Sequence, residues 1–145
     1  MHTLRTALAL LTLVAAMFLG PAVLAESVSF KADLKASNEV PSVESKGSGT
    51  LTATYDTASK SLNYTANYSG LTDDATAAHF HGPAAAGQNA GVVVPVTGSA
   101  ASPIKGSATL TDAQAADLMA GRWYFNIHTA ANKGGEIRGQ VEKGR

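Results

Sequence analysis

The sequence predicts an all-β protein, an antiparallel Greek-key β-sandwich with one short helix. Three observations support this fold. Short segments in which apolar and polar residues alternate recur along the chain, and this period belongs to strands with one buried face. Clusters rich in Gly, Pro, Asn and Asp separate these segments, as turns do. Only one segment carries both a helix start signal and a helix stop signal.

The expected strands follow one another with mostly short connections. In the first, residues 28–34, Val28, Phe30 and Leu34 alternate with polar residues. Residues 56–60 form the loop of an expected hairpin. The further expected strands, each rich in Val, Ile, Thr or aromatic residues or continuous in apolar ones, are residues 47–55, 61–68, 77–81, 92–96, 105–110, 123–129 and 136–141.

The helix is expected near residues 111–120. Thr111 and Gln114 have the spacing of a capping box, in which each side chain bonds a free amide of the first turn. Gly121 suits the position after the helix because glycine readily adopts positive φ.

Residues 1–25 have the features of a secretory signal peptide. Arg5 supplies a positive charge, residues 7–19 are almost all apolar, and Ala25 offers a small residue for cleavage. The apolar run is shorter than the ~20 residues that span a bilayer. The alternative is an uncleaved membrane anchor. We expect export to the periplasm or the medium, with residues 26–145 as a single domain.

Composition limits the possible partners. The chain has eleven Lys and Arg against eleven Asp and Glu, so nucleic acid is an unsuitable partner for its surface. It contains no cysteine. An exported chain without disulfides depends on its core, or on a bound ligand or metal.

The histidines outside the signal peptide suggest a metal site. His79 and His81 are two apart on an expected strand, so both point to one face while Phe80 points to the other. On a second strand Trp123, Phe125 and Ile127 form the apolar face, which leaves Asn126 and His128 on the reverse face. If the two strands are neighbours, the three imidazoles share one surface. Surface or structural histidines are the alternative interpretation.

A site of three imidazoles suits copper or zinc, and the general affinity order favours copper, with zinc as second choice. Four further residues are candidates to orient the ligands or to add one: Glu39, Asn126, Glu136 and Arg138. Glu136 and Arg138 are two apart, and we expect them to form a surface or half-buried ion pair that supports the last strand. Glu39 is a possible fourth ligand, although its segment is equally typical of a turn.

Several motifs resemble the CHRD domain, named for chordin and also found in bacterial exported proteins. They are residues 36–41 (ASNEVP), 78–84 (AHFHGPA), 110–114 (LTDAQ) and 126–140, which begins NIHT and ends GEIRGQ. Ser42 replaces a usual proline. The histidine spacing is also similar to the copper side of Cu,Zn superoxide dismutase, which implies a superoxide dismutase-like sandwich; an immunoglobulin-like one is the alternative. The bridging histidine, zinc ligands and disulfide of that enzyme have no counterpart here.

The leading hypothesis is therefore an exported protein that binds, stores or delivers copper through His79, His81 and His128. The alternative is a metal-free module that binds another exported protein or a matrix component. A small copper redox enzyme is a third hypothesis. Neither a nucleophile elbow nor a phosphate-binding loop occurs in the sequence.

Overall fold

The computed structural model describes residues 20, 22 and 24–144. The expected signal peptide falls mostly outside these residues and stays a prediction. The described chain forms eight strands: β1 (Ser27–Lys35), β2 (Ser48–Asp56), β3 (Ser61–Ser69), β4 (Ala75–His81), β5 (Val92–Pro95), β6 (Ile104–Thr109), β7 (Trp123–Thr129) and β8 (Ile137–Lys143). It also forms a 3-10 helix, η1 (Ala36–Asn38), and one α-helix, α1 (Asp112–Met119).

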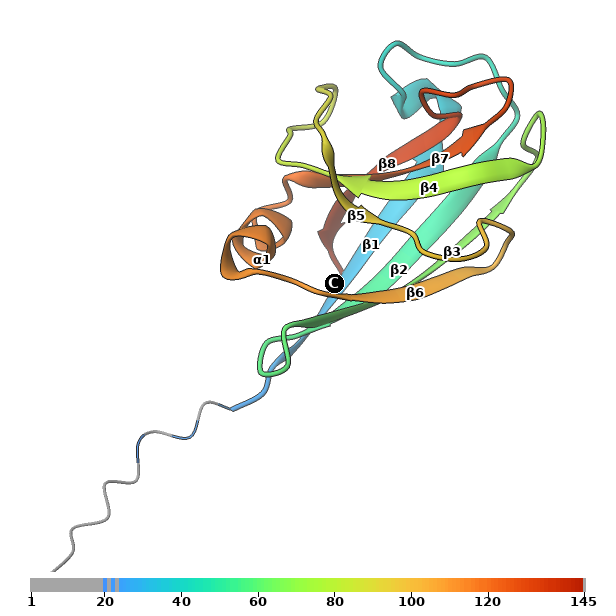
Figure 1. Cartoon of the computed structure of the whole chain (residues 1–145). Helices are drawn as coiled ribbons and strands as arrows, with labels where there is room; N and C mark the ends of the chain where they lie inside the picture. The colour runs from blue at the N-terminus through green and yellow to red at the C-terminus, as the bar shows by residue number, and fades with distance from the viewer. Residues whose placement is uncertain (1–19, 21, 23, 145) are drawn as a thin grey trace, which may run out of the picture.

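All eight strands belong to one antiparallel sheet, in the order β5-β4-β7-β8-β1-β2-β3-β6. The sheet curls into a nearly closed barrel (Figure 1), with β5 and β6 as its two edges. The all-β antiparallel fold with one short helix is confirmed. A sandwich would have two sheets, whereas here β8 also pairs with β1 and joins the halves. Gly139 permits this approach, because a side chain there would overlap the backbone of Asp33.

The interior of the barrel is filled by the inward faces of the strands. Phe80 contacts Tyr64 and Phe125 edge to face, with ring centroids 5.0 and 4.8 Å apart. Trp123, Phe125 and Ile127 are fully buried in this core, as their alternation predicts.

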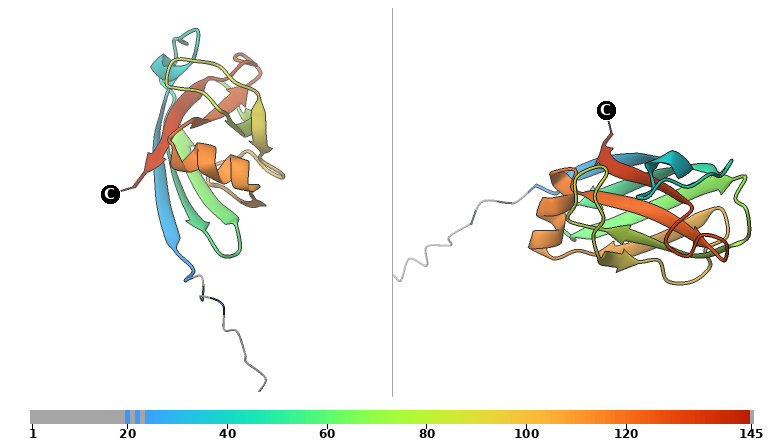
Figure 2. Two further views of the ribbon diagram at one scale, coloured as in Figure 1. Left: turned by 90° about the vertical axis from the view of Figure 1, so that its left-hand side faces the viewer. Right: turned by 90° about the horizontal axis from the view of Figure 1, so that it is seen from above.

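The helix α1 begins with the expected capping box, in which Thr111 and Gln114 each bond the other's backbone amide. Gly121 follows it with φ of +69°, a conformation that favours glycine. Leu118 joins the helix to the core. The helix lies at one end of the barrel and the β7–β8 turn at the other (Figure 2). In the part of the chain that the structure describes, no helix is long and apolar enough to cross a membrane.

The strand β7 is buried on both faces, since all seven of its residues are buried. One face meets the core. The other lies under three loops: residues 36–47 between β1 and β2, residues 82–91 between β4 and β5, and residues 130–136 between β7 and β8. These covered side chains form the candidate site.

Candidate metal centre

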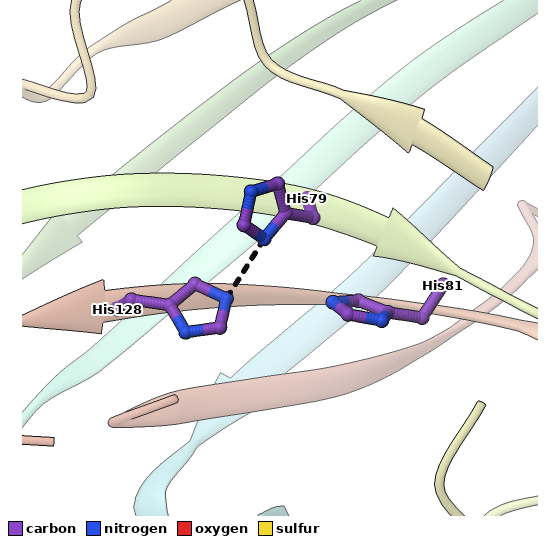
Figure 3. Close-up of side chains that lie close together, drawn as sticks. All are labelled: His79, His81 and His128. Carbon is purple, nitrogen blue, oxygen red and sulfur yellow. Dashed lines mark hydrogen bonds between the residues drawn. The ribbon is translucent and has the colours of Figure 1, made fainter. Parts of the chain in front are cut away.

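The three histidines meet on the outer face of β4 and β7. These strands are neighbours, and their register sets His79 opposite Asn126 and His81 opposite Tyr124. His128 lies two residues from Asn126, so it is the diagonal neighbour of His79. One nitrogen from each ring can be chosen so that all three lie within 4.8 Å of one another. Figure 3 shows the rings converging from the two strands. The shared site expected from side-chain alternation is therefore present as a cluster.

Hydrogen bonds fix the ring nitrogens of His128. Its Nδ1 lies 2.8 Å from the Lys133 carbonyl oxygen, so Nδ1 carries the hydrogen and donates it. The other nitrogen, Nε2, then carries a lone pair and accepts a hydrogen bond from Nδ1 of His79 at 2.9 Å (Figure 3). This backbone bond to the ring is the usual means by which a protein orients a metal-ligating histidine.

Both nitrogens of His81 face oxygen acceptors. Nδ1 lies 3.0 Å from the Ala90 carbonyl oxygen, and Nε2 lies 3.0 Å from Oδ1 of Asn126. A neutral imidazole has one N–H, so it cannot donate to both oxygens. The pKa of His81 is lowered, first by burial and also by the nearby His128 and Arg138, although the two hydrogen bonds oppose the shift, so the neutral form is favoured. One lone pair of His81 therefore faces an oxygen, and a cation bound there would remove that repulsion.

The pKa of His79 is also lowered, first by burial and then by the neighbouring His128 and His81 rings. A metal ion binds only the neutral form of imidazole, so these shifts favour ligation at neutral pH.

Tyr124 stacks beside His81. The two rings are parallel within 3°, with centroids 4.7 Å apart. The guanidinium carbon of Arg138 lies 3.4 Å from the centre of the same tyrosine ring. Since β7 lies between β4 and β8, Tyr124 separates the histidine from the arginine. Alternation along β7 predicts Tyr124 on the same outer face as Asn126 and His128, but it does not predict the stacking on His81.

The loop of residues 82–91 closes over this layer. Arg138 donates to Oδ1 of Asn89 at 2.8 Å and to the Gln88 carbonyl oxygen. Asn89 in turn donates to the Val40 carbonyl oxygen at 3.0 Å, which ties the loop to the segment after η1. The Gly, Ala and Pro content of this loop predicted a connection but gave no sign that it covers the site.

The prediction of an ion pair between Glu136 and Arg138 is wrong. Among the described residues the ion pairs are Lys60–Asp112 and Arg122–Asp117. Glu136 precedes β8 and is bound elsewhere. Its Oε1 accepts from Ser45 Oγ at 2.5 Å and from the amide and hydroxyl of Thr72 at 2.7 and 2.9 Å, and its Oε2 accepts from Thr129 Oγ1 at 2.7 Å. Each of its four donors carries no charge.

These bonds set the charge of Glu136. Burial by itself raises the pKa of the carboxyl, but the bonds from Ser45, Thr129 and Thr72 together outweigh it and lower the pKa to about 2. Because Thr129 follows His128 and Thr72 precedes β4, the carboxylate holds both histidine strands at their ends.

Glu39 is buried next to Asn126 and outside the three-histidine group. Its Oε1 is buried and has no hydrogen-bond partner among the described residues. Burial raises the pKa of Glu39 to about 7, although Arg138 and the Asn126 amide oppose the shift. Gly135, at φ of +128°, leaves room for this arrangement, since a side chain there would overlap both Glu39 and Asn126. The structure thus supplies no support for Glu39 as a fourth ligand.

The fold and the cluster define a β-barrel-like protein with a three-histidine centre, and comparison places it in a family. Residues 30–141 match the CHRD domain, which is most of the chain. The protein belongs to the CHRD domain family, as its motifs predicted. No curated protein and no solved structure matches the chain.

Proposed function

We propose that the protein is an exported copper-binding protein that binds, stores or delivers the ion through His79, His81 and His128. The observation that carries the proposal is the convergence of three ring nitrogens within 4.8 Å on one covered face. No thiolate is available, because the chain has no cysteine. Imidazole sites bind copper ahead of zinc in the general affinity order, and zinc is the second choice.

The hydrogen bond between His79 and His128 fits the same proposal. Nδ1 of His79 and Nε2 of His128 are 2.9 Å apart, and the bond between them needs a hydrogen on one of the two nitrogens. An ion bound by both rings would replace that hydrogen, because metal binding releases protons from its ligands.

The proposal is tested by titrating the purified protein with Cu(II), Cu(I) and Zn(II) against a competing chelator. We expect one equivalent of Cu(II) to bind more tightly than Zn(II). Alanine at His79, His81 or His128 should weaken binding by at least about tenfold. Met119→Leu is the matched control, because Met119 is the one thioether outside the signal peptide and packs against the core. Tighter zinc binding, or three alanine variants with unchanged affinity, would overturn the proposal.

Acid should release the ion. Ligation needs neutral rings, so affinity should fall once the pH drops below about 6.5, the ordinary pKa of histidine. The lowered pKa values of His79 and His81 move this loss to lower pH. A chelator competition repeated between neutral and acidic pH measures the effect.

A metal-free interaction module is the second candidate. The strands β5 and β6 are edges of the sheet, and Val92 on β5 is 49% exposed. An edge strand offers backbone groups for pairing with another chain. This function would lead if no ion bound. A copper redox activity ranks third, and an assay for copper-dependent oxidation tests it.

The proposal also includes export of the protein and a Greek-key topology. Export as a single domain from residue 26 rests on the signal-like residues 1–25, and mass spectrometry of the native protein would test it. The Greek-key classification near superoxide dismutase rests on the return of β8 to pair with β1 and on the His-x-His spacing. An experimental structure that fails to superpose on that enzyme would exclude it.

A further inference from the structure

Arg138 is a buried cation without a carboxylate partner. Its side chain is among the largest that are fully buried, and the residue is 2% exposed. Neither ion pair among the described residues includes it. Two of its N–H groups bond the neutral oxygens of Asn89 and Gln88, and its guanidinium covers Tyr124. Buried charges in proteins are normally paired with an opposite charge, because these neutral contacts compensate only part of the lost hydration.

Arg138 lines a cavity of about 290 Å³. It is lined by Ser37, Asn38, Glu39, Val40, Ala86, Gly87, Arg138 and Gln140. The two amide side chains direct their N–H groups elsewhere: Asn38 donates to the Arg138 carbonyl oxygen and Gln140 to Ala84 and Gly121. Arg138 is therefore the main positive group of the cavity. The volume approaches the lower end of small-ligand pockets.

We propose that this cavity binds a small organic carboxylate, whose oxygens pair with the Arg138 guanidinium. The planar guanidinium matches a carboxylate in shape and charge. Chain contacts hold it in place, so little side-chain entropy is lost on binding. The site lies beyond Tyr124 from the histidines and does not depend on copper.

Glu39 supports the same ligand. It lines the cavity, and burial raises its pKa to about 7, so near neutral pH a large fraction of the side chain is protonated. A protonated carboxyl donates a hydrogen bond to a bound carboxylate, whereas an ionised one repels it. The carboxyl most able to serve as an internal partner for Arg138 is thus held near neutrality.

The test is an NMR titration of the full purified chain, without added metal, with acetate and with its neutral isostere acetamide. We expect saturable shifts at Ala86, Gly87 and Arg138 with acetate, at a Kd on the order of 1 mM, and none with acetamide. Equal shifts from both compounds, or none from acetate, would overturn the proposal.

Variants separate binding from folding. Arg138→Gln should weaken acetate binding at least about tenfold, and so should Ala86→Trp, which fills the cavity from an exposed position and removes no buried group. Glu39→Gln should tighten binding at pH 8, because it removes a competing negative charge. Arg122→Gln, at an exposed ion pair with Asp117, is the matched control and should bind like the wild type.

Arg138 also holds the loop of residues 82–91, so a structural role needs its own control. Asn89→Ala removes one loop contact but leaves the guanidinium in place. Acetate affinity within about threefold of wild type in this variant supports direct binding. A loss as large as that of Arg138→Gln would show that Arg138 acts only through the loop, and would overturn the proposal.

Discussion

Two buried glutamates flank the histidine cluster and differ in almost every physical respect. Glu136 accepts four hydrogen bonds from neutral donors, and its pKa is lowered to about 2. Glu39 has an oxygen without a partner, and burial raises its pKa to about 7. Both are at most 6% exposed. Burial alone therefore does not determine the charge of a carboxyl; the number of donors that reach it does.

The two glutamates have different roles. Glu136 joins the segment before β4 to the last residue of β7, so it fixes the ends of the strands that carry the histidines. The charge of Glu39 changes with pH near neutrality, and a ligand bound beside it would shift its pKa. Substitution of Glu136 should therefore lower the free energy of unfolding. Substitution of Glu39 should instead alter ligand binding and the pH dependence of the free energy of unfolding.

The largest effect is expected from Glu136→Ala. It leaves the donors of Ser45, Thr72 and Thr129 without their shared acceptor, and breaking such a buried network costs about 3–5 kcal/mol of unfolding free energy. Urea unfolding measures this cost. Glu39→Ala should lower stability far less, and an equal loss in both variants would erase the distinction between the two glutamates.

Acid unfolding sharpens the contrast. The folded pKa of Glu136 is below its unfolded value of 4.5, so the unfolded state binds more protons between about pH 2 and 4.5. Stability from this group, about 3 kcal/mol, is present above pH 4.5 and is lost as the pH falls toward 2. Unfolding free energies measured across this range should show the loss in the wild type and not in Glu136→Gln.

For Glu39 the free energy of unfolding should change with pH in the opposite direction. Its folded pKa of about 7 exceeds the unfolded 4.5, so the folded state binds more protons between these values. Its contribution is complete below pH 4.5 and declines by up to about 3 kcal/mol as the pH rises to 7. Glu39→Gln should remove this decline, and urea unfolding at pH 5 and pH 8 checks it. The same pH dependence in variant and wild type would contradict the assignment.

Gly135→Ala should disturb the Glu39 region while leaving the donors of Glu136 in place. A non-glycine residue at φ of +128° is strained, and its side chain would overlap Glu39 and Asn126. We expect a loss of about 2 kcal/mol, together with weaker copper binding through Asn126. Thermal unfolding and the chelator competition measure the two effects. Gly134→Ala is the neighbouring control, because a side chain there meets open space.

The last prediction concerns Asn126→Asp, which changes one contact of His81 and keeps the shape of the side chain. A carboxylate oxygen accepts from Nε2 more strongly than an amide oxygen, so the hydrogen on Nε2 becomes harder to displace. Copper affinity should fall by roughly tenfold. Stability should fall as well, because the new carboxylate is buried and can no longer donate to the Gly134 carbonyl oxygen or to Glu39. Unchanged affinity would show that His81 does not use Nε2.

The local elements and the grouping of the histidines could be predicted because both depend on short-range rules. Alternation placed Phe80 inward with His79 and His81 outward, and it gave the same order to Phe125 and His128. Their meeting also needed β4 and β7 to be neighbours, which the register confirms. The prediction of two separate sheets was less accurate, because β8 pairs with β1 and all strands belong to one sheet. That pairing joins strands far apart in the sequence, so local patterns do not reveal it.

By itself, the sequence determined the strand segments, the capped helix, the family and the face that carries the histidines. These follow from side-chain period, capping chemistry and motif order, all of which act over a few residues. Only the tertiary structure decided the environment of the charged groups. Two glutamates of identical chemistry acquired opposite pKa shifts, and Arg138 contacted Tyr124 and a loop in place of Glu136. Those outcomes depend on which distant loops cover each side chain, because burial and hydrogen-bond donors come from segments far apart in the chain.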